Sequence, residues 1–437
     1  MGFMASIRRT ADATPAERNR VVDLLRAASI LVVIFGHWLM AAVTVEDGEL
    51  IPGHLLILAD WTHPLTWVFQ VMPVFFLVGG YANGLSWRSA RRRSETYGGW
   101  LRSRLRRLIL PVVPLLLFWT AFGWLGLRLG LSWEVLQLAS QVALVPTWFL
   151  AAYVVIVTIA PIGLWIWDRW GWWSIVVGIA LAGACDYLSI SVGMVPVGFL
   201  NYLLVWGTVH QIGYAWLDGT IDRTWKRAGL AVVGFLGTLI LVWIGPYPVA
   251  MVGLDTAEIT NSYPPRVTLA FLGMFQAGIA LLLEPALARL MQRRAAWVFV
   301  VGVSARIMTM YLWHLTAMVI VIGLSMATGG FGLGIEPLTT TWWLTRPLWF
   351  LLVGMVTIAM VAVFGRFETP VDDPRPAPAW WRPVIAVLAV CAGLGLLAAI
   401  GIADADGLNG LVLTLPIIGV VVGGIARLPG NRVLTRS

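Results

Sequence analysis

Long apolar segments alternate with short polar segments over most of this 437-residue chain. Twelve of the apolar segments approach the roughly 20 residues that a helix needs to cross about 30 Å of hydrocarbon. The pattern therefore predicts an all-α polytopic membrane protein. The predicted spans are residues 24–44, 65–87, 108–131, 148–167, 172–190, 199–217, 228–245, 267–283, 297–324, 347–365, 384–402 and 408–426.

The connection between the tenth and eleventh spans, RFETPVDDPRPAPAWWR, is charged and rich in Pro, a composition typical of linkers. It predicts four parts: a cytoplasmic N-terminal segment (1–20), a ten-helix membrane domain (21–366), a Pro-rich linker (367–383), and two additional spans with a tail (384–437). The first 20 residues lack the short apolar core and cleavage site of a signal peptide, so we expect the first span to act as the insertion signal.

The composition supports a membrane protein, because 59% of the residues are hydrophobic and only 12% are charged. The net charge of +8 could indicate nucleic acid or anionic lipid, so its distribution decides between them. The basic residues gather in alternate loops and at both termini, whereas the bodies of the opposite loops contain no Arg or Lys. By the positive-inside rule, both termini are cytoplasmic and the first span runs outwards. No soluble domain accompanies the charge, so we do not expect nucleic-acid binding.

The stretch RVVDLLRAASILVVIFGHWLM, residues 20–40, places three ionisable residues in or beside the first span: Asp23, Arg26 and His37. At about 100° per residue, Arg26 and His37 lie within roughly 20° of each other around the helix and about 16 Å apart along it. Asp23 falls on nearly the same face, three residues from Arg26, where the two can form an ion pair. Ionisable groups inside a span are costly and usually functional.

His37 and Arg26 each allow two interpretations. His37 can be a packed histidine bonded to a backbone carbonyl, or a neutral imidazole that accepts a proton from a hydroxyl or becomes acylated itself. We favour the second, since it shares a face with Arg26 and Asp23. Arg26 is either a topology determinant that reaches the interface or a guanidinium that binds phosphate, and the sequence leaves both open.

The other histidines are less informative. His314, in the ninth span, lies eight residues after Arg306 and could hold the acceptor or assist proton transfer, or it could be an interfacial structural residue. We expect His210 to be structural. His54 and His63, in the first outer loop, match no metal-ligand spacing, and no metal is predicted.

Two loop regions are candidate substrate contacts. Topology explains most of the basic stretch before the third span, but the arginines nearest the membrane could hold the phosphates of coenzyme A: Arg102, Arg104, Arg106 and Arg107. The first outer loop is acidic, and a solvated face explains most of that charge. Acceptor binding is the alternative, with the candidates Glu46, Asp47, Asp60 and His63.

Several local patterns together resemble acyltransferase family 3, the integral-membrane acyltransferases of bacteria. The most specific is an Arg, ten residues and a His, here Arg26 and His37. The others are FFLVGGY ending at Tyr81, RLRRLILP at residues 104–111, WFL at 148–150 and YLWH at 311–314. The resemblance covers about residues 20–366. It departs from the family at Gly79, where a serine is usual, so no hydroxyl role is assigned there.

The resemblance implies a ten-helix enzyme of the bacterial cytoplasmic membrane. Such an enzyme takes an acyl group, here expected to be acetyl, from cytoplasmic acyl-CoA and passes it to a hydroxyl outside the cell. We therefore expect His37 and His314 to be catalytic and Asp23 and Arg26 to lie in the donor site. The expected partners are the lipid bilayer, an extracytoplasmic glycan or glycolipid, and other envelope-biosynthesis proteins.

Two other classes of function stay open at this point. A proton-coupled transporter or exporter would also need many spans with intramembrane Asp, Arg and His. Release of free thiol from acyl-CoA distinguishes the enzyme from this carrier. A non-catalytic scaffold in an envelope-assembly complex is the third class, but it leaves the polar face of the first span unexplained.

Overall fold

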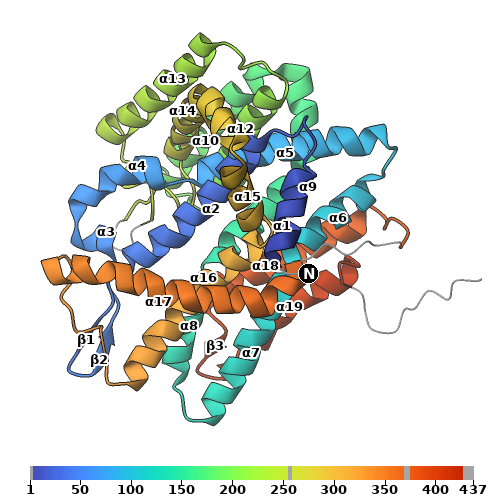
Figure 1. The fold of residues 1–437 in the computed structure, drawn as a ribbon. Coiled ribbons are helices and arrows are strands. Elements are labelled where there is room, and N and C mark those ends of the chain that lie inside the picture. Colours follow the sequence, from blue (N-terminus) through green and yellow to red (C-terminus); the bar gives the residue numbers. More distant parts are fainter. Residues whose placement is uncertain (1–2, 254–257, 369–374, 427–437) are drawn as a thin grey trace, which may run out of the picture. The chain divides into compact units, whose positions relative to one another are not determined.

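The computed structural model describes residues 3–253, 258–368 and 375–426, and these are mainly helical, with two short two-stranded sheets (Figure 1). The chain divides into two units, each of which is described by itself. Unit 1 contains residues 1–86, 159–307 and 324–350. Unit 2 contains residues 87–158, 308–323 and 351–437.

Unit 1 begins with two helices, α1 (Phe3–Asp12) and α2 (Arg20–Met40), and then a group of short elements. These are β1 (Thr44–Glu46), β2 (Glu49–Ile51), α3 (Leu55–Leu58), η1 (Asp60–Leu65) and α4 (Thr66–Phe69). The unit continues with most of α5 (Met72–Arg92), the end of α9 (Pro146–Trp170), α10 (Trp172–Ile190), α11 (Val195–Gly198), α12 (Asn201–Leu217), α13 (Thr224–Ile244), α14 (Val267–Gln292), α15 (Arg294–Ser304) and the start of α17 (Thr340–Phe364).

Unit 2 holds the end of α5, the start of α9, most of α16 (Ile307–Ala327) and the end of α17. Its remaining elements are α6 (Tyr97–Ile109), α7 (Val112–Arg128), α8 (Trp133–Leu144), η2 (Gly365–Glu368), α18 (Trp381–Ile400), β3 (Ala403–Asp404), β4 (Gly407–Leu408) and α19 (Gly410–Val422). The two final helices, α18 and α19, pack against each other.

The predicted class, an all-α polytopic membrane protein, is confirmed. Within the described ranges, nine helices are long and apolar enough to cross a membrane, or ten if α6 and α7, bent by 41° at their junction, form one span. The sixth and twelfth predicted spans coincide with α12 and α19, which have 17 and 13 residues. Both are shorter than the roughly 20 residues of a straight crossing.

The predicted ninth span, residues 297–324, is not one continuous helix. It is interrupted between α15 and α16, where Arg306 has φ −137° and ψ 24°. The Glu368 carboxylate accepts hydrogen bonds from the backbone N–H groups of Met308 and Thr309, each at 3.0 Å. A carboxylate in this position caps the first turn of α16 and favours a helix start there. In the sequence the break coincides with Ser304 and Arg306, which are polar positions in an otherwise apolar run.

The predicted division of the chain at residue 366 stays a prediction. Six residues of the proposed linker, 369–374, lie outside the described residues, as does the tail from residue 427.

The N-terminal segment contains a helix that the sequence analysis did not predict. Residues 3–12 form α1, which packs on α15 in unit 1. The Arg294 guanidinium donates to the Asp12 carboxylate at 2.9 Å and thereby lowers the pKa of Asp12.

One glycine of the second predicted span, Gly80, has a packing role in unit 1. A Cβ added to Gly80 would strike the carbonyl oxygen of His210 on α12, and one added to Gly213 would strike the carbonyl oxygen of Leu77 on α5. The two backbones can approach this closely only because neither residue has a side chain. Next to this contact, Asn83 Nδ2 lies 3.2 Å from His210 Nε2 in the buried interior, as expected for a structural histidine.

The short elements after α2 hold its C-terminal end. The Ala42 N–H donates to the Gly53 carbonyl at 3.0 Å, and Ala41 pairs with His54 in an isolated β-bridge. A buried apolar cluster lies beside these contacts and consists of Ala42, Leu55, Ala59 and Trp342. The chain following α2 is therefore fixed against the start of α17 rather than left as an open loop.

Candidate active site

Helix α2 carries the three ionisable residues of the predicted site. The Asn19 side chain caps its start by accepting a hydrogen bond from the Val21 N–H at 3.1 Å. Asp23 lies on the buried stripe of the helix with Ala27, Ile30, Ile34 and Trp38, whose spacing repeats every three or four residues. The helix thus begins at its polar end and buries an acidic side chain within one turn.

At the N-terminal end of α2, two guanidinium groups share one carboxylate. Arg26 Nη2 lies 2.9 Å from Asp23 Oδ1, so the predicted ion pair is confirmed. Arg18 binds the same carboxylate through both Nε, at 2.6 Å, and Nη2, at 2.9 Å. This hydrogen bond raises the pKa of Arg18. Asp23 is 5% exposed.

This guanidinium cluster, defined as Arg18, Asp23 and Arg26, retains a net charge of +1 when all three groups are ionised. The Arg26 side chain is 32% exposed, yet its Nε is buried without a hydrogen-bond partner among the described residues. An unsatisfied buried donor is costly. The cluster therefore offers both a surplus positive charge and an unused donor to an anionic ligand.

His37 lies eleven residues after Arg26, three residues before α2 ends, and is partly exposed. One ring nitrogen of His37 donates a hydrogen bond to the Val33 carbonyl, one turn earlier in the same helix. In a neutral imidazole the second nitrogen then carries the lone pair. His54 lies close enough to interact electrostatically with His37. The ring is thus oriented by its own helix, and the second nitrogen of the neutral ring can accept a proton.

His314 lies on α16 and is described with unit 2. Its side chain is fully buried, and Nδ1 lies 2.6 Å from the Tyr311 carbonyl oxygen. The Tyr311 hydroxyl in turn donates to the Pro146 carbonyl at 2.9 Å. As in His37, a backbone carbonyl of the same helix orients one ring nitrogen.

The predicted coenzyme A arginines all lie on α6 of unit 2, but they differ in their contacts. Arg102 is buried and donates to the backbone carbonyls of Arg375 and Pro376 at 2.8 and 2.9 Å. Its guanidinium therefore fixes the chain that precedes α18. The other three are partly buried or exposed: Arg104, Arg106 and Arg107.

The predicted acceptor residues occupy the short elements after α2. Glu46 and Asp47 lie at the turn of the β1–β2 hairpin, where Asp47 and Gly48 have φ of 52° and 84°. The Asp60 side chain is 93% exposed and lies 3.7 Å from His63 Nε2. His63 Nε2 also lies 2.7 Å from the Leu56 carbonyl. The structure brings Asp60 and His63 together, while Glu46 and Asp47 sit on the separate hairpin.

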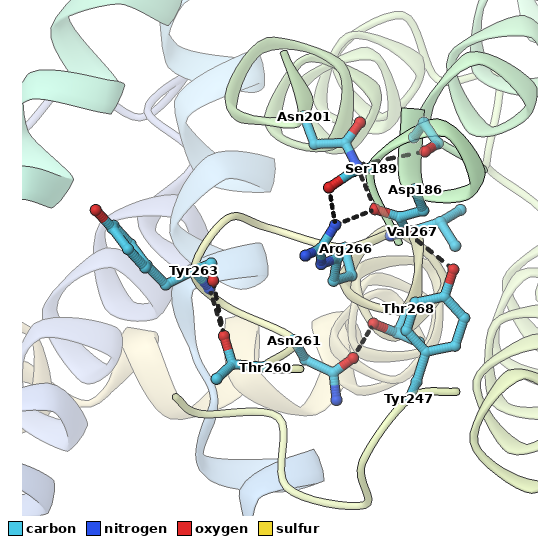
Figure 2. Close-up of polar contacts among 11 residues, drawn as sticks. Asp186, Ser189, Asn201, Tyr247, Thr260, Asn261, Tyr263, Arg266, Val267 and Thr268 are labelled. Atoms are coloured by element: carbon cyan, nitrogen blue, oxygen red, sulfur yellow. Dashed lines mark hydrogen bonds and ion pairs between the residues drawn. The ribbon is translucent and has the colours of Figure 1, made fainter. Parts of the chain in front are cut away.

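A buried ion pair in unit 1 was missed by the sequence analysis (Figure 2). Arg266, which precedes α14, places Nη1 3.2 Å from Oδ1 of Asp186 on α10. The Asp186 carboxylate, which is fully buried, also accepts hydrogen bonds from Asn201 Nδ2 at 2.8 Å, the Tyr247 hydroxyl at 3.0 Å and the Val267 N–H at 2.8 Å. The signals were an acidic residue in an apolar span and an arginine at a span end predicted to face outwards, where Arg128 and Arg346 are the other basic residues.

This network has a structural role, because it holds several segments of unit 1 together. Every oxygen of Asp186 is satisfied, and its four donors come from α12, the loop after α13, and the start of α14. Burial and the adjacent Asp186 charge raise the pKa of Tyr247, which keeps its hydroxyl protonated as a donor. In the residues that the structure describes, no cluster of three or more His, Cys, Asp or Glu side chains could hold a metal ion.

The fold and α2 together define an integral-membrane protein whose first span joins a cationic cluster to an oriented imidazole. The sequence model of a family described as an acyltransferase domain, acyltransferase family 3, matches residues 19–366. Because this match covers most of the chain, the protein belongs to that family and is a membrane acyltransferase, as the resemblance implied. Comparison with curated proteins and with solved structures gave no match.

Proposed function

We propose that this acyltransferase moves an acyl group, with acetyl as the simplest case, from cytoplasmic acyl-CoA to a hydroxyl of an acceptor on the other side of the membrane. The acceptor is a carbohydrate or glycolipid of the cell envelope, and the membrane is the bacterial cytoplasmic membrane, with both termini inside. One observation carries the proposal: α2 holds a surplus positive charge at its N-terminal end and an oriented imidazole eleven residues later on the same face.

The guanidinium cluster binds the phosphates of coenzyme A. Guanidinium groups bind phosphate through paired hydrogen bonds, and the unused Nε of Arg26 supplies one of these donors. The extended pantetheine arm then runs along the about 16 Å of helix between Arg26 and His37 and brings the thioester to the imidazole. Arg104, Arg106 and Arg107 of unit 2 stay predicted donor contacts.

At His37, the unprotonated ring nitrogen takes the proton of the acceptor hydroxyl as its oxygen attacks the thioester carbonyl. The new C–O bond forms, the C–S bond breaks, and the proton passes from His37 to the departing thiolate of coenzyme A. In the alternative route, His37 itself attacks the thioester, the C–S bond breaks and the coenzyme A thiolate leaves. The acceptor hydroxyl then cleaves the acyl-imidazole, which releases His37 and a proton that the thiolate takes up. His314 is the second candidate for moving a proton.

Replacing Arg26 or Arg18 by Gln should weaken coenzyme A binding by about 10-fold or more. Each change removes a charge-assisted hydrogen bond to phosphate, which contributes roughly 1.5–3 kcal/mol. Isothermal titration of purified protein in lipid nanodiscs with coenzyme A measures this effect directly.

The matched control is Arg9→Gln, which removes an exposed arginine from α1 without touching the cluster. It should leave the dissociation constant unchanged. If a folded Arg26→Gln protein binds coenzyme A as tightly as the unchanged protein does, Arg26 does not belong to the donor site.

A further inference from the structure

Arg346, in the first part of α17, is a partly buried cation, and its contacts among the described residues include no carboxylate. Within the described residues, its Nη1 donates to the Ala41 carbonyl at 3.4 Å, and its guanidinium carbon lies 4.1 and 5.5 Å from the ring centroids of Trp342 and Trp349. Its Nε is buried and has no hydrogen-bond partner there. Four of its five N–H donors are thus left unused by these contacts.

Two other arginines of unit 1 show how this chain normally treats a buried guanidinium. Arg266 pairs with Asp186, and Arg227 pairs with Glu284 at 2.8 Å while also donating to the carbonyls of Ile221 and Leu281. Their charges are neutralised internally. For Arg346, stacking on tryptophan and one long bond to a carbonyl offset only part of the cost of removing the cation from water.

The backbone of Ala41 connects Arg346 to the proposed reaction centre. The Ala41 N–H donates to the His37 carbonyl at 3.2 Å, its carbonyl accepts from Arg346, and its backbone pairs with His54. His54 Nδ1 accepts a hydrogen bond from the Leu56 N–H at 3.3 Å, so in the neutral ring Nε2 carries the proton. The Arg346 guanidinium and the backbones of His37 and His54 therefore all contact Ala41, the first residue after α2.

From this arrangement we propose that Arg346 binds an anionic group of the acceptor, either a phosphate or a carboxylate, and thereby positions its hydroxyl at His37. The inference rests on the proposed function and narrows its acceptor to acidic or phosphorylated carbohydrates and glycolipids. The unused donors of a guanidinium match these planar or tetrahedral oxyanions, whereas a neutral sugar would leave the charge without a partner.

Titration calorimetry with three matched probes tests the inference: glucuronate, glucose 1-phosphate and methyl glucoside. The protein is held in zwitterionic nanodiscs with saturating coenzyme A, so that the guanidinium cluster is occupied. At least one anionic probe should bind, and Arg346→Gln should weaken that binding by about 10-fold or more while the neutral probe and coenzyme A are unaffected. Arg346→Lys, which keeps the charge, should retain part of the affinity.

The control is Arg128→Gln at the end of α7, an exposed arginine that also lies over a tryptophan, at 5.2 Å from the Trp124 ring centroid. It should change nothing. The inference is overturned if neither anion binds, if Arg346→Gln weakens all three probes equally, or if anionic phosphatidylglycerol in the nanodisc displaces the sugars, which would identify a lipid headgroup site. Failure of coenzyme A to bind would instead count against the proposed function. Binding of the three probes to Arg26→Gln protein, whose guanidinium cluster is weakened, would then still test Arg346.

Discussion

Replacing His37 by Gln should lower acyl transfer by about 100-fold or more and leave a folded, membrane-inserted protein. General-base catalysis by a positioned side chain commonly contributes 10²- to 10⁴-fold, and Gln has no basic nitrogen to replace the lone pair of the imidazole. Coenzyme A affinity should stay unchanged, because the nearest member of the guanidinium cluster, Arg26, lies eleven residues away. Transfer of a radiolabelled acyl group and release of free thiol by purified protein measure the loss.

His210→Gln is the matched control, since it makes the same substitution at another histidine of unit 1. That side chain is buried beside Asn83 and has no role in the proposed reaction. The change should lower the yield of folded protein but keep the turnover of each folded molecule. Normal turnover in folded His37→Gln protein would remove His37 from the reaction.

The second large effect concerns stability rather than catalysis. Asp186→Ala should destabilise the protein by about 3–5 kcal/mol, because it leaves the Arg266 guanidinium buried without its partner. The same change also removes the acceptor for the Tyr247 hydroxyl and the Val267 N–H. Unfolding in mixed micelles, followed by circular dichroism as denaturing detergent is added, gives the difference in free energy.

Two further variants show whether the unpaired charge is the cause. The double variant Asp186→Leu/Arg266→Met should lose less stability than Asp186→Ala, because neither charge is then left buried. Asp60→Ala, at a carboxylate that is 93% exposed, should stay within about 0.5 kcal/mol of the unchanged protein. A loss in Asp186→Ala no greater than that of Asp60→Ala would contradict the assignment of a structural ion pair.

The sequence was sufficient for most of the long helices and for the ion pair near the start of α2. Hydropathy located the spans because lipid imposes a length and an apolar composition on each crossing, and α10 begins and ends at the predicted residues. The pairing of Asp23 with Arg26 followed from their spacing on one helix. Such local, periodic relations are encoded within a few turns.

Relations between distant segments were not predictable in this way. Arg18 lies in the polar segment before α2, where no periodicity indicates that its guanidinium turns back to Asp23. Arg266 is eighty residues from Asp186, and the Ala41 carbonyl is more than three hundred residues from Arg346. The cap that Glu368 places on α16 is likewise non-local. These contacts depend on tertiary packing, which hydropathy and spacing do not contain.

The most direct test of the proposed function is transfer across a sealed membrane. Purified protein is reconstituted into vesicles that contain an acidic glycan, and radiolabelled acetyl-CoA is added only outside, so that molecules with both termini outside can use it. The account predicts labelled glycan inside the vesicles, an equal amount of free thiol outside, and neither product with His37→Gln protein. No labelled glycan inside the vesicles, or no thiol release by folded protein, would contradict transfer from cytoplasmic acyl-CoA to an acceptor across the membrane.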